Sequence, residues 1–503
     1  MFWGRRERRE RRDMDSRMKR GPRCAGQRLE ITALALLLFF PFANAAEHKV
    51  STPADIAAAA KTAAPGDVLL MADGTWRDAK IVFQAEGTSA QPITLRAESP
   101  GRVVLTGESW LRMAGKHLVV DGLRFENCNS TRDVMEFRAD SKRLAHQCRL
   151  TNCAFVDCNP PDGETNTRWI SIYGVGNRVD HCYVRGKANV GATLVVWLAE
   201  ESPHHLIDHN HFAPRPRLKV NGGETIRVGD STKARIAARC LVESNLFEAC
   251  NGEAEIISNK SRENVYRRNT FLACEGALTL RVGSGCLVEG NFFLGNHKRL
   301  TGGVRVIDED QRVINNYFAE LDGEGTRAAL CLMNGIPDSS PAGYYRVKRA
   351  VVAFNTFVDC KESMVIGYVY HDASLPPEDC VFANNLVVGA RGPFVRQITA
   401  PERATWLGNI MFGAAPGLPE QPGVIRVDPK LARGPDGLWR PDPNSPVRGA
   451  ASDEFPLVRV DRDGQPRVGR KDIGCDQLAD GAISSRPLAP DDVGPAWMRG
   501  GQP

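Results

Sequence analysis

A short pattern of hydrophobic and polar positions recurs along most of the chain. It consists of an aliphatic residue, two variable residues, an asparagine, one further residue, and then Phe or another apolar residue. Clear copies read IDHNHF from position 207, VESNLF from 242 and VAFNTF from 352. The asparagines are Asn210, Asn245, Asn269, Asn291, Asn316, Asn355, Asn385 and Asn409, at spacings of 35, 24, 22, 25, 39, 30 and 24 residues. We interpret the larger spacings as insertions into a unit of 22–25 residues.

Each unit holds short alternating apolar runs rich in Val, Ile and Phe, separated by Gly, Asn and Asp, with little helical periodicity. Leucine-rich repeats have a similar length, but their leucine spacing and helix are missing here. Ankyrin and tetratricopeptide units are longer and helical. The pattern therefore predicts an all-β chain: a single-domain, right-handed parallel β-helix whose coils stack around one continuous core.

The asparagine of each unit is expected at a bend between strands. Asparagine tolerates the left-handed backbone conformation, and its amide can form a ladder with the copies above and below. Cys153 and Cys182 fall in the same position of earlier units. We therefore interpret most cysteines as small, buried and reduced core residues.

The two ends of the repeat carry different signals. Thr52 is a candidate N-cap, with Pro53 in the first turn and Asp55 close behind, so an Ala-rich helix is expected to cover the first coil. After about residue 415 the repeat gives way to Pro- and Gly-rich chain, which predicts a loop-rich C-terminal cover. We expect the β-helix domain to span residues 46–480 and residues 481–503 to form a disordered tail.

The N-terminal segment has the pattern of a signal peptide. Residues 1–30 contain eleven Lys/Arg and five Asp/Glu, a net charge of +6, and an uncharged run then leads to ANAA at 43–46. We expect residues 1–45 to be removed, with Met18 as an alternative start and no membrane anchor left after cleavage. The net charge of +5 then becomes 5 − 6 = −1, which argues against nucleic-acid binding. Export to the periplasm or the medium follows.

Spacing in a solenoid predicts which residues are neighbours, because positions one coil apart lie about 5 Å apart along the stack. Two groups of polar residues within otherwise apolar strands fall in register by this rule. The amide and acidic residues are Asn221, Glu224, Glu253 and Glu255, and the basic residues are Arg227, Lys260, Arg281 and Arg305. Carboxylate and amide oxygens suit Ca²⁺. Salt bridges between these acids and arginines on a solvated face are the alternative.

A cation flanked by arginines would attract an extended anionic substrate, such as an acidic polysaccharide. Neutralising a uronate carboxylate favours loss of the neighbouring C-5 proton, and departure of the C-4 oxygen then completes a β-elimination. Lys260 is the candidate base and Arg281 the group that stabilises or protonates the leaving oxygen. A hydrolase would need two acids flanking the bond. The acids at 308–310 could serve, but their pattern predicts a turn.

Several linked motifs resemble polysaccharide lyase family six, the alginate lyase and chondroitinase B family. They are NGGETIRVGDS at 221–231, NGEAEIISNKS at 251–261, LTLRVG at 278–283 and GGVRVIDEDQRVINNYF at 302–318, within a resemblance that covers roughly residues 48–480. The resemblance implies a parallel β-helix with Lys260 as base and Arg281 as acid. It implies Ca²⁺ ligands at Asn221, Glu253 and Glu255 with Glu224 nearby, substrate binding by Arg305, and sugar contact by Tyr344 or Tyr345. Val282 departs from the His that alginate-active relatives often carry there.

Among possible substrates we expect alginate, cleaved as in mannuronate-type lyases, although periodicity carries no information on the choice between mannuronate and guluronate. A chondroitinase B-like lyase acting on dermatan sulfate is the first alternative. A non-catalytic β-helix that binds anionic glycans is the second, and it predicts loss of the lysine or arginine, both of which are present. The chain is expected to act as a monomer or a simple homodimer.

Overall fold

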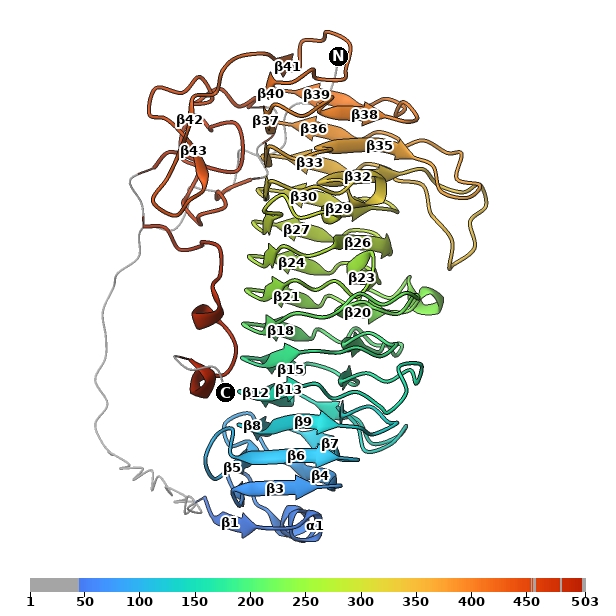
Figure 1. Cartoon of the computed structure of the whole chain (residues 1–503), viewed down its shortest axis with the longest axis vertical. Coiled ribbons are helices and arrows are strands. Elements are labelled where there is room, and N and C mark those ends of the chain that lie inside the picture. Colours follow the sequence, from blue (N-terminus) through green and yellow to red (C-terminus); the bar gives the residue numbers. More distant parts are fainter. Residues whose placement is uncertain (1–44, 454, 456–457, 480–481, 500–503) are drawn as a thin grey trace, which may run out of the picture. The chain divides into compact units, whose positions relative to one another are not determined.

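The computed structural model describes residues 45–453, 455, 458–479 and 482–499. The predicted signal peptide at 1–45 therefore lies, apart from Ala45, outside the described residues. The predicted parallel β-helix is confirmed: the strands form three long parallel sheets, which stack coil by coil from α1 (Pro53–Thr62) at the bottom of Figure 1 to β41 (Val424–Ile425) at the top. None of the helices among the described residues is long and apolar enough to span a bilayer.

The three long sheets are named A, B and C, and their strands are given in the order of their pairing. Sheet A contains β1 (Glu47–Val50), β2 (Val68–Met71), β5 (Ile93–Ala97), β8 (Leu118–Asp121), β12 (Arg149–Thr151), β15 (Arg178–Asp180), β18 (Leu206–Asp208), β21 (Leu241–Glu243), β24 (Val265–Arg267), β27 (Leu287–Glu289), β30 (Arg312–Ile314), β33 (Val351–Ala353), β36 (Val381–Ala383) and β39 (Thr405–Leu407). Sheet B contains β3 (Gly74–Arg77), β6 (Val103–Gly107), β9 (Arg124–Cys128), β13 (Ala154–Val156), β16 (Tyr183–Arg185), β19 (His211–Phe212), β22 (Leu246–Glu248), β25 (Thr270–Leu272), β28 (Phe292–Leu294), β31 (Tyr317–Ala319), β34 (Thr356–Val358), β37 (Leu386–Gly389), β40 (Asn409–Gly413) and β41 (Val424–Ile425). Sheet C contains β11 (Ala145–His146), β7 (Trp110–Lys116), β10 (Met135–Glu136), β14 (Ile170–Ile172), β17 (Leu194–Val196), β20 (Ile226–Gly229), β23 (Glu255–Lys260), β26 (Gly276–Val282), β29 (Thr301–Val306), β32 (Leu330–Met333), β35 (Met364–Tyr368) and β38 (Val395–Gln397), with β4 (Lys80–Glu86) beside β7.

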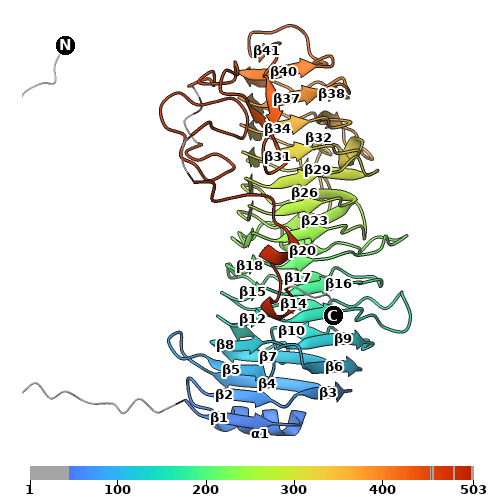
Figure 2. The same ribbon diagram turned by 60° about the vertical axis from the view of Figure 1, so that its left-hand side comes forward.

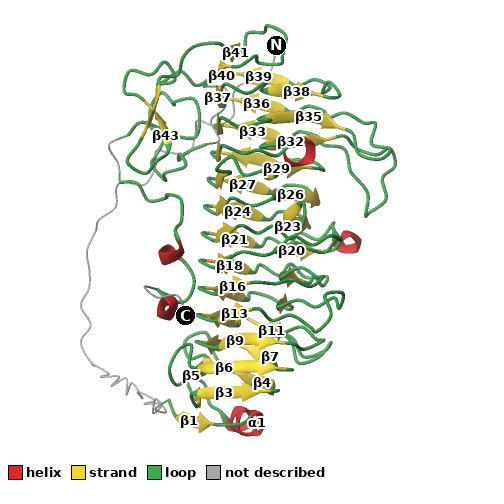
Figure 3. Ribbon diagram, viewed as in Figure 1, coloured by secondary structure: helices red, strands yellow, loops and turns green. Residues whose placement is uncertain are grey.

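The remaining elements are short. A hairpin joins β42 (Leu431–Arg433) and β43 (Trp439–Pro441) in antiparallel pairing. The 3-10 helices are η1 (Ser231–Lys233), η2 (Gly325–Arg327), η3 (Pro490–Asp492) and η4 (Ala496–Met498). Figure 3 shows how little of the described chain is helical.

The repeated asparagines form a continuous hydrogen-bonded ladder at the bend between sheets A and B. The Asn269 amide is typical of the interior rungs: its Oδ1 accepts from the backbone N–H and the Nδ2 of Asn245, both at 3.0 Å. Its Nδ2 donates to Oδ1 of Asn291, also at 3.0 Å. The predicted ladder is confirmed, but the left-handed backbone belongs to the residue before each asparagine, as at Ser244 (φ 53°) and Arg268 (φ 53°).

The apolar residue of each repeat packs inside the coil. Six phenylalanines stack along the axis with ring centroids 4.6 to 5.0 Å apart: Phe212, Phe247, Phe271, Phe293, Phe318 and Phe357. The cysteines among the described residues are all free and buried, as predicted. Burial raises the pKa of several of these thiols, for example that of Cys240 to about 12.

Both ends of the stack are covered. Thr52 and Asp55 form the predicted capping box of α1, which buries Ile56 and Ala60 against the first coils. After β41 the chain folds back along the side of the upper coils (Figures 1 and 2). This cover packs Leu438 onto sheet B beside Tyr317, and other apolar residues of the cover pack against the outside of sheet A.

The last described segment, residues 482–499, differs from the expected disordered tail. It runs along the β-helix and is held by hydrogen bonds from Leu488 N to Thr270 Oγ1 (2.8 Å), from Gly494 N to the His209 carbonyl (2.9 Å), and from Trp497 Nε1 to the Asn152 carbonyl (2.8 Å). Those partners lie in or beside the strands of sheets A and B. The cover and the tail therefore leave the outer face of sheet C to the functional site.

Candidate active site

The outer face of sheet C carries a row of polar side chains on four neighbouring strands, β20, β23, β26 and β29. Their register aligns Arg227 with Ser258, Ser258 with Thr279, and Thr279 with Arg305. The residues just before them in the strands are Ile226, Ile257, Leu278 and Val304, which lie in the core. Because side chains alternate along a strand, the polar row faces outward, as the spacing predicted.

Lys260 and Arg281 extend this outward face at the carboxyl ends of two adjacent strands. Lys260 ends β23, where Asn259 points inward to bond the buried Tyr266 hydroxyl (2.8 Å), and Arg281 lies between two buried residues of β26. Asn259 pairs with Leu280 and Lys260 pairs with Val282, so Arg281 is the extra, unpaired residue of β26 at this β-bulge. Both side chains are partly exposed. The structure thus brings the candidate base and acid together on one face.

The connection from β32 to β33, residues 334–350, reaches over Arg281. The Arg281 guanidinium donates to the carbonyls of Gly343 (2.6 Å) and Ala342 (3.0 Å), and it stacks 3.9 Å from the centre of the Tyr344 ring. Tyr345 instead lies 4.4 Å from the guanidinium of Arg235. Of the two candidate tyrosines, Tyr344 therefore joins the Lys260–Arg281 pair, and Tyr345 lies against a different side chain.

The predicted acidic residues gather at the other end of the same strands. Gly223 and Gly252 precede Glu224 and Glu253, and a Cβ on Gly252 would collide with the Gly223 carbonyl, so glycine allows the two backbones to approach. Burial, and then the charges of Glu224 and Glu255, raise the pKa of Glu253 to about 8. The crowded carboxylates and their burial therefore disfavour a further negative charge at Glu253.

Two further observations bear on cation binding. Glu224 is buried, and its Oε2 has no hydrogen-bond partner among the described residues. Asn221 is exposed and lines, together with Glu253, a pocket of about 300 Å³. Unpartnered oxygen donors beside a crowded set of carboxylates fit a hard cation such as Ca²⁺.

Glu255 also has a protein partner. It forms an ion pair with Arg305, and both side chains are largely buried. The salt-bridge alternative thus describes this pair. A second acidic group lies in the C-terminal cover. Among the described residues, Asp461, Asp463 and Asp476 have carboxylate oxygens that all lie within 4.8 Å of one another. Arg440 bonds Asp463 and Asp476, so that group is an internal ion-pair network.

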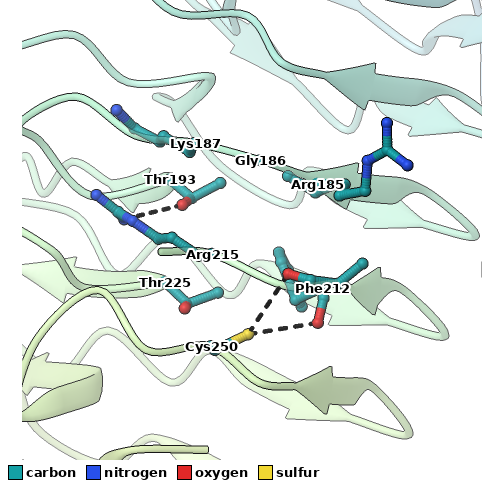
Figure 4. Close-up of a pocket in the computed structure, with 10 residues that line it drawn as sticks. Arg185, Gly186, Lys187, Thr193, Phe212, Arg215, Thr225 and Cys250 are labelled. Atoms are coloured by element: carbon teal, nitrogen blue, oxygen red, sulfur yellow. Dashed lines mark hydrogen bonds between the residues drawn. The ribbon is translucent and has the colours of Figure 1, made fainter. Parts of the chain in front are cut away.

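The buried Arg215 contacts the backbone of the acidic cluster. It donates to the Glu224 carbonyl (2.7 Å) and to Thr193 Oγ1 (3.1 Å). Figure 4 shows the bond to Thr193. Arg215 lines a small internal cavity of about 10 Å³, and Lys187 extends beside it. Burial lowers the pKa of Arg215 to about 10 and that of Lys187 to about 6. Neither residue belongs to the repeated pattern, so the spacing did not predict them.

One side chain near Arg227 also escaped the sequence analysis. The Trp197 ring lies 5.1 Å from the Arg227 guanidinium, directly after the strand that pairs with β20. The coil spacing of 30 residues between them is the signal that could have found it. Arg227 is thereby held at the edge of the polar row, where burial lowers its pKa.

Comparison with known proteins identifies relatives of this fold and site. The sequence model of the chondroitinase B family matches residues 50–389. The structure of the PL6 family alginate lyase AlyGC is similar with a TM-score of 0.80 and 35% identity, covering 91% of this chain and 59% of that chain. A mannuronic acid-specific family 6 lyase from human gut microbiota has a TM-score of 0.70 and 31% identity, covering 76% of this chain and 91% of that chain.

The chain spans about three fifths of the length of AlyGC. Among curated proteins, none matches the chain with significant similarity. The family match nevertheless covers most of the β-helix, and the structural match to the gut lyase covers nearly all of that enzyme. The chain therefore belongs to polysaccharide lyase family 6, which includes alginate lyases, and matches the chondroitinase B family.

Proposed function

We propose that this protein is a lyase that cleaves alginate by β-elimination. One observation carries the proposal: Lys260 and Arg281 lie on adjacent strands of sheet C, and Arg227 and Arg305 stand at the two ends of the polar row on the same face. The acidic cluster lies at the opposite end of β23, roughly 16 Å along a six-residue strand. Ser258 lies between these two ends of β23, so a sugar ring bound over Ser258 would have Lys260 and Arg281 on one side and the acidic cluster on the other.

In this proposal the neutral amine of Lys260 removes the C-5 proton of a uronate. The C–H electron pair forms the C-4=C-5 double bond, and the C-4–O bond breaks with its electrons on the oxygen. Arg281 donates an N–H to that oxygen as its negative charge develops. The leaving oxygen takes its proton through Arg281, which regains one from solvent water, and Lys260 later releases the C-5 proton to solvent, so the proton balance closes. The carbonyls of Gly343 and Ala342 and the Tyr344 ring orient the guanidinium for this role.

We further propose that Asn221, Glu224, Glu253 and Glu255 are the residues that would hold Ca²⁺. When bound, the ion would supply positive charge to neutralise the uronate carboxylate. The unpartnered Glu224 oxygen and the raised pKa of Glu253 support this assignment. For Glu255 it requires that the carboxylate serve both Arg305 and the ion.

Alginate is preferred over dermatan sulfate because the solved relatives at 35% and 31% identity are an alginate lyase and a mannuronic acid-specific lyase. The second relative supports mannuronate as the preferred unit. A chondroitinase B-like activity on dermatan sulfate is the second candidate, because the family model that matches residues 50–389 is that of chondroitinase B.

The substrate is tested by incubating the purified protein with alginate, poly-mannuronate, poly-guluronate, dermatan sulfate and polygalacturonate, with and without a chelator. The absorbance of the unsaturated uronate reports cleavage. We expect product from alginate and poly-mannuronate, with loss of activity in chelator and recovery on adding Ca²⁺. Product from dermatan sulfate alone would reject alginate as the substrate.

The base is tested by Lys260→Ala, which should lower kcat at least about 1,000-fold, within the range that a general base contributes. Lys49→Ala is the matched control, because Lys49 is a surface lysine of sheet A, paired with Glu98 (3.4 Å), and does not belong to sheet C. Full activity of Lys260→Ala would remove Lys260 from the mechanism. Export and the monomeric or dimeric state stay predictions, to be checked by cell fractionation and by light scattering.

A further inference from the structure

The pocket beside the acidic cluster contains an arginine to which the proposed reaction assigns no role. Its polar walls are formed by Arg217, Lys219, Asn221, Glu253, Glu275 and Arg327. Arg327 ends the short helix η2 and is half-buried, and its Nε is buried without a hydrogen-bond partner. Within the described residues no carboxylate pairs with its guanidinium.

The other charges near Arg327 are already paired or crowded. Arg217 bonds Glu275 through its Nε (3.0 Å), and Arg305 pairs with Glu255. Burial, and then the nearby charges of Arg305 and Arg217, lower the pKa of Arg327. The nearby carboxylates of Glu275 and Glu253 oppose this shift, but Glu275 is bonded to Arg217 and neither carboxylate forms an ion pair with Arg327 among the described residues. A half-desolvated cation without a paired anion is unfavourable. The walls of the pocket therefore favour an anionic ligand at Arg327.

The backbone around Arg327 is held closely against sheet C. Gly302 in β29 approaches the Arg327 carbonyl, where a Cβ would stand 2.8 Å away. Gly325 has φ +59° and lies against the Tyr368 ring, so a side chain there would be strained and would clash. Gly325 N also donates to Glu362 Oε2 (2.6 Å). These contacts fix the end of η2 at the rim of the pocket.

The position of η2 indicates which part of a polymer Arg327 would meet. The chain leads from η2 into β32, which is three strands from β23 in sheet C, or about 14 Å along the stack. We propose that Arg327 binds the carboxylate of a uronate unit beyond the one adjacent to the unit held at Lys260, at a distance that a dimer bound at Lys260 does not reach. This inference rests on the proposed lyase function and adds a specificity-determining residue to it. A guanidinium suits this task because it can bond both oxygens of a carboxylate.

The test measures binding and turnover separately. Saturated oligo-mannuronates of two to six units are titrated calorimetrically into Lys260→Ala protein, which prevents cleavage, with and without Arg327→Met. We expect Arg327→Met to weaken binding of the longer oligomers about 10- to 100-fold and to leave the dimer unchanged. In otherwise wild-type protein the same change should raise KM for the longer oligomers and leave kcat nearly constant.

The matched control is Arg299→Met, which removes one positive charge from an exposed arginine outside the pocket lining. It should change binding less than about twofold. Arg327→Lys, which keeps the charge but loses the planar fork, should recover part of the affinity and guards against a folding defect in the Met variant. Oligomers whose carboxylates are methyl-esterified should bind equally well to the proteins with and without Arg327→Met.

Equal affinity of the two proteins for every oligomer length would overturn the role of Arg327 while leaving the lyase proposal intact. Equal losses from Arg327→Met and Arg299→Met would also overturn it, because the effect would then be general electrostatics. Failure of wild-type protein to cleave or bind any polyuronate would instead reject the proposed function itself. The outcomes therefore separate the two claims.

Discussion

Replacing one interior rung of the asparagine ladder should destabilise the whole β-helix. Asn269 is fully buried, and its side chain makes four hydrogen bonds: it accepts two from Asn245 and donates one each to Asn291 and Val242. Asn269→Ala removes all four. The substitution leaves the fold's apolar core intact, so the change isolates the polar ladder.

The magnitude follows from which partners stay unsatisfied. The Asn245 Nδ2 keeps the carbonyls of Ile207 (2.9 Å) and Glu243 (3.0 Å), and Asn291 Oδ1 keeps the Asn269 backbone N–H (3.0 Å). The Asn245 backbone N–H and the Val242 carbonyl each lose the Asn269 side chain as a partner. At about 1–3 kcal/mol for each buried unsatisfied group, the free energy of unfolding should fall by about 2–6 kcal/mol.

Urea unfolding followed by circular dichroism, with refolding curves that superimpose, measures this change as a shift of the midpoint at constant m-value. Asn166→Ala is the control, because Asn166 is exposed, and its effect should stay within about 0.5 kcal/mol. A loss below about 1 kcal/mol for Asn269→Ala, no larger than for the control, would refute the ladder as a source of stability.

Three further outcomes are expected. Burial lowers the pKa of Lys187 from its ordinary 10.5 to about 6, so between these pH values the folded state binds fewer protons than the unfolded state, and the wild type loses stability as the pH falls. Lys187→Met should therefore stabilise the protein more at pH 6 than at pH 9 in urea titrations. An equal gain at both pH values would contradict the buried position of the Lys187 ammonium. Phe271→Ala, which removes a ring stacked 4.7 and 4.6 Å from its neighbours, should cost about 3–5 kcal/mol by the same assay, with a smaller loss for Phe271→Leu. Trp497→Ala should speed amide hydrogen exchange of residues 488–499 without changing lyase activity, because Trp497 anchors the tail on Asn152 away from sheet C; lost activity would place the tail in the site.

The β-helix could be predicted because one periodic pattern records both the strand faces and the coil length. Asn269 and Phe271, two residues apart, specify the ladder and the ring stack at once. The pattern does not say which residue of a bend takes the left-handed conformation. We expected it at the asparagine, but an asparagine whose amide must align with its copies keeps an ordinary backbone, and the preceding residue takes the turn.

The tail and the insertions escaped prediction for a related reason. Residues 482–499 bond the β-helix through individual groups such as Trp497 Nε1, which leave no periodic trace. The connection at 334–350 likewise places Tyr344 on Arg281 by its own path, outside the coil register. Spacing could align Lys260 with Arg281, since both belong to strands, but it could not place Arg327, which belongs to a short helix between strands.

The ion pair between Glu255 and Arg305 bears on the two alternatives that the coil spacing left open, a cation site and salt bridges between the acids and the arginines. Glu224, Glu253 and Glu255 carry three potential negative charges, of which Arg305 balances one directly, and the buried Arg215 contacts the backbone of the cluster. The cluster alone would thus repel a polyanion. In the proposed site a divalent cation would neutralise this charge, so that Arg227 and Arg281 on sheet C and Arg327 in η2 could attract a polyanion. The observed salt bridge is therefore compatible with the proposed cation site: the pair holds Glu255 in place, and the remaining negative charge is what a bound cation would neutralise before a uronate could approach.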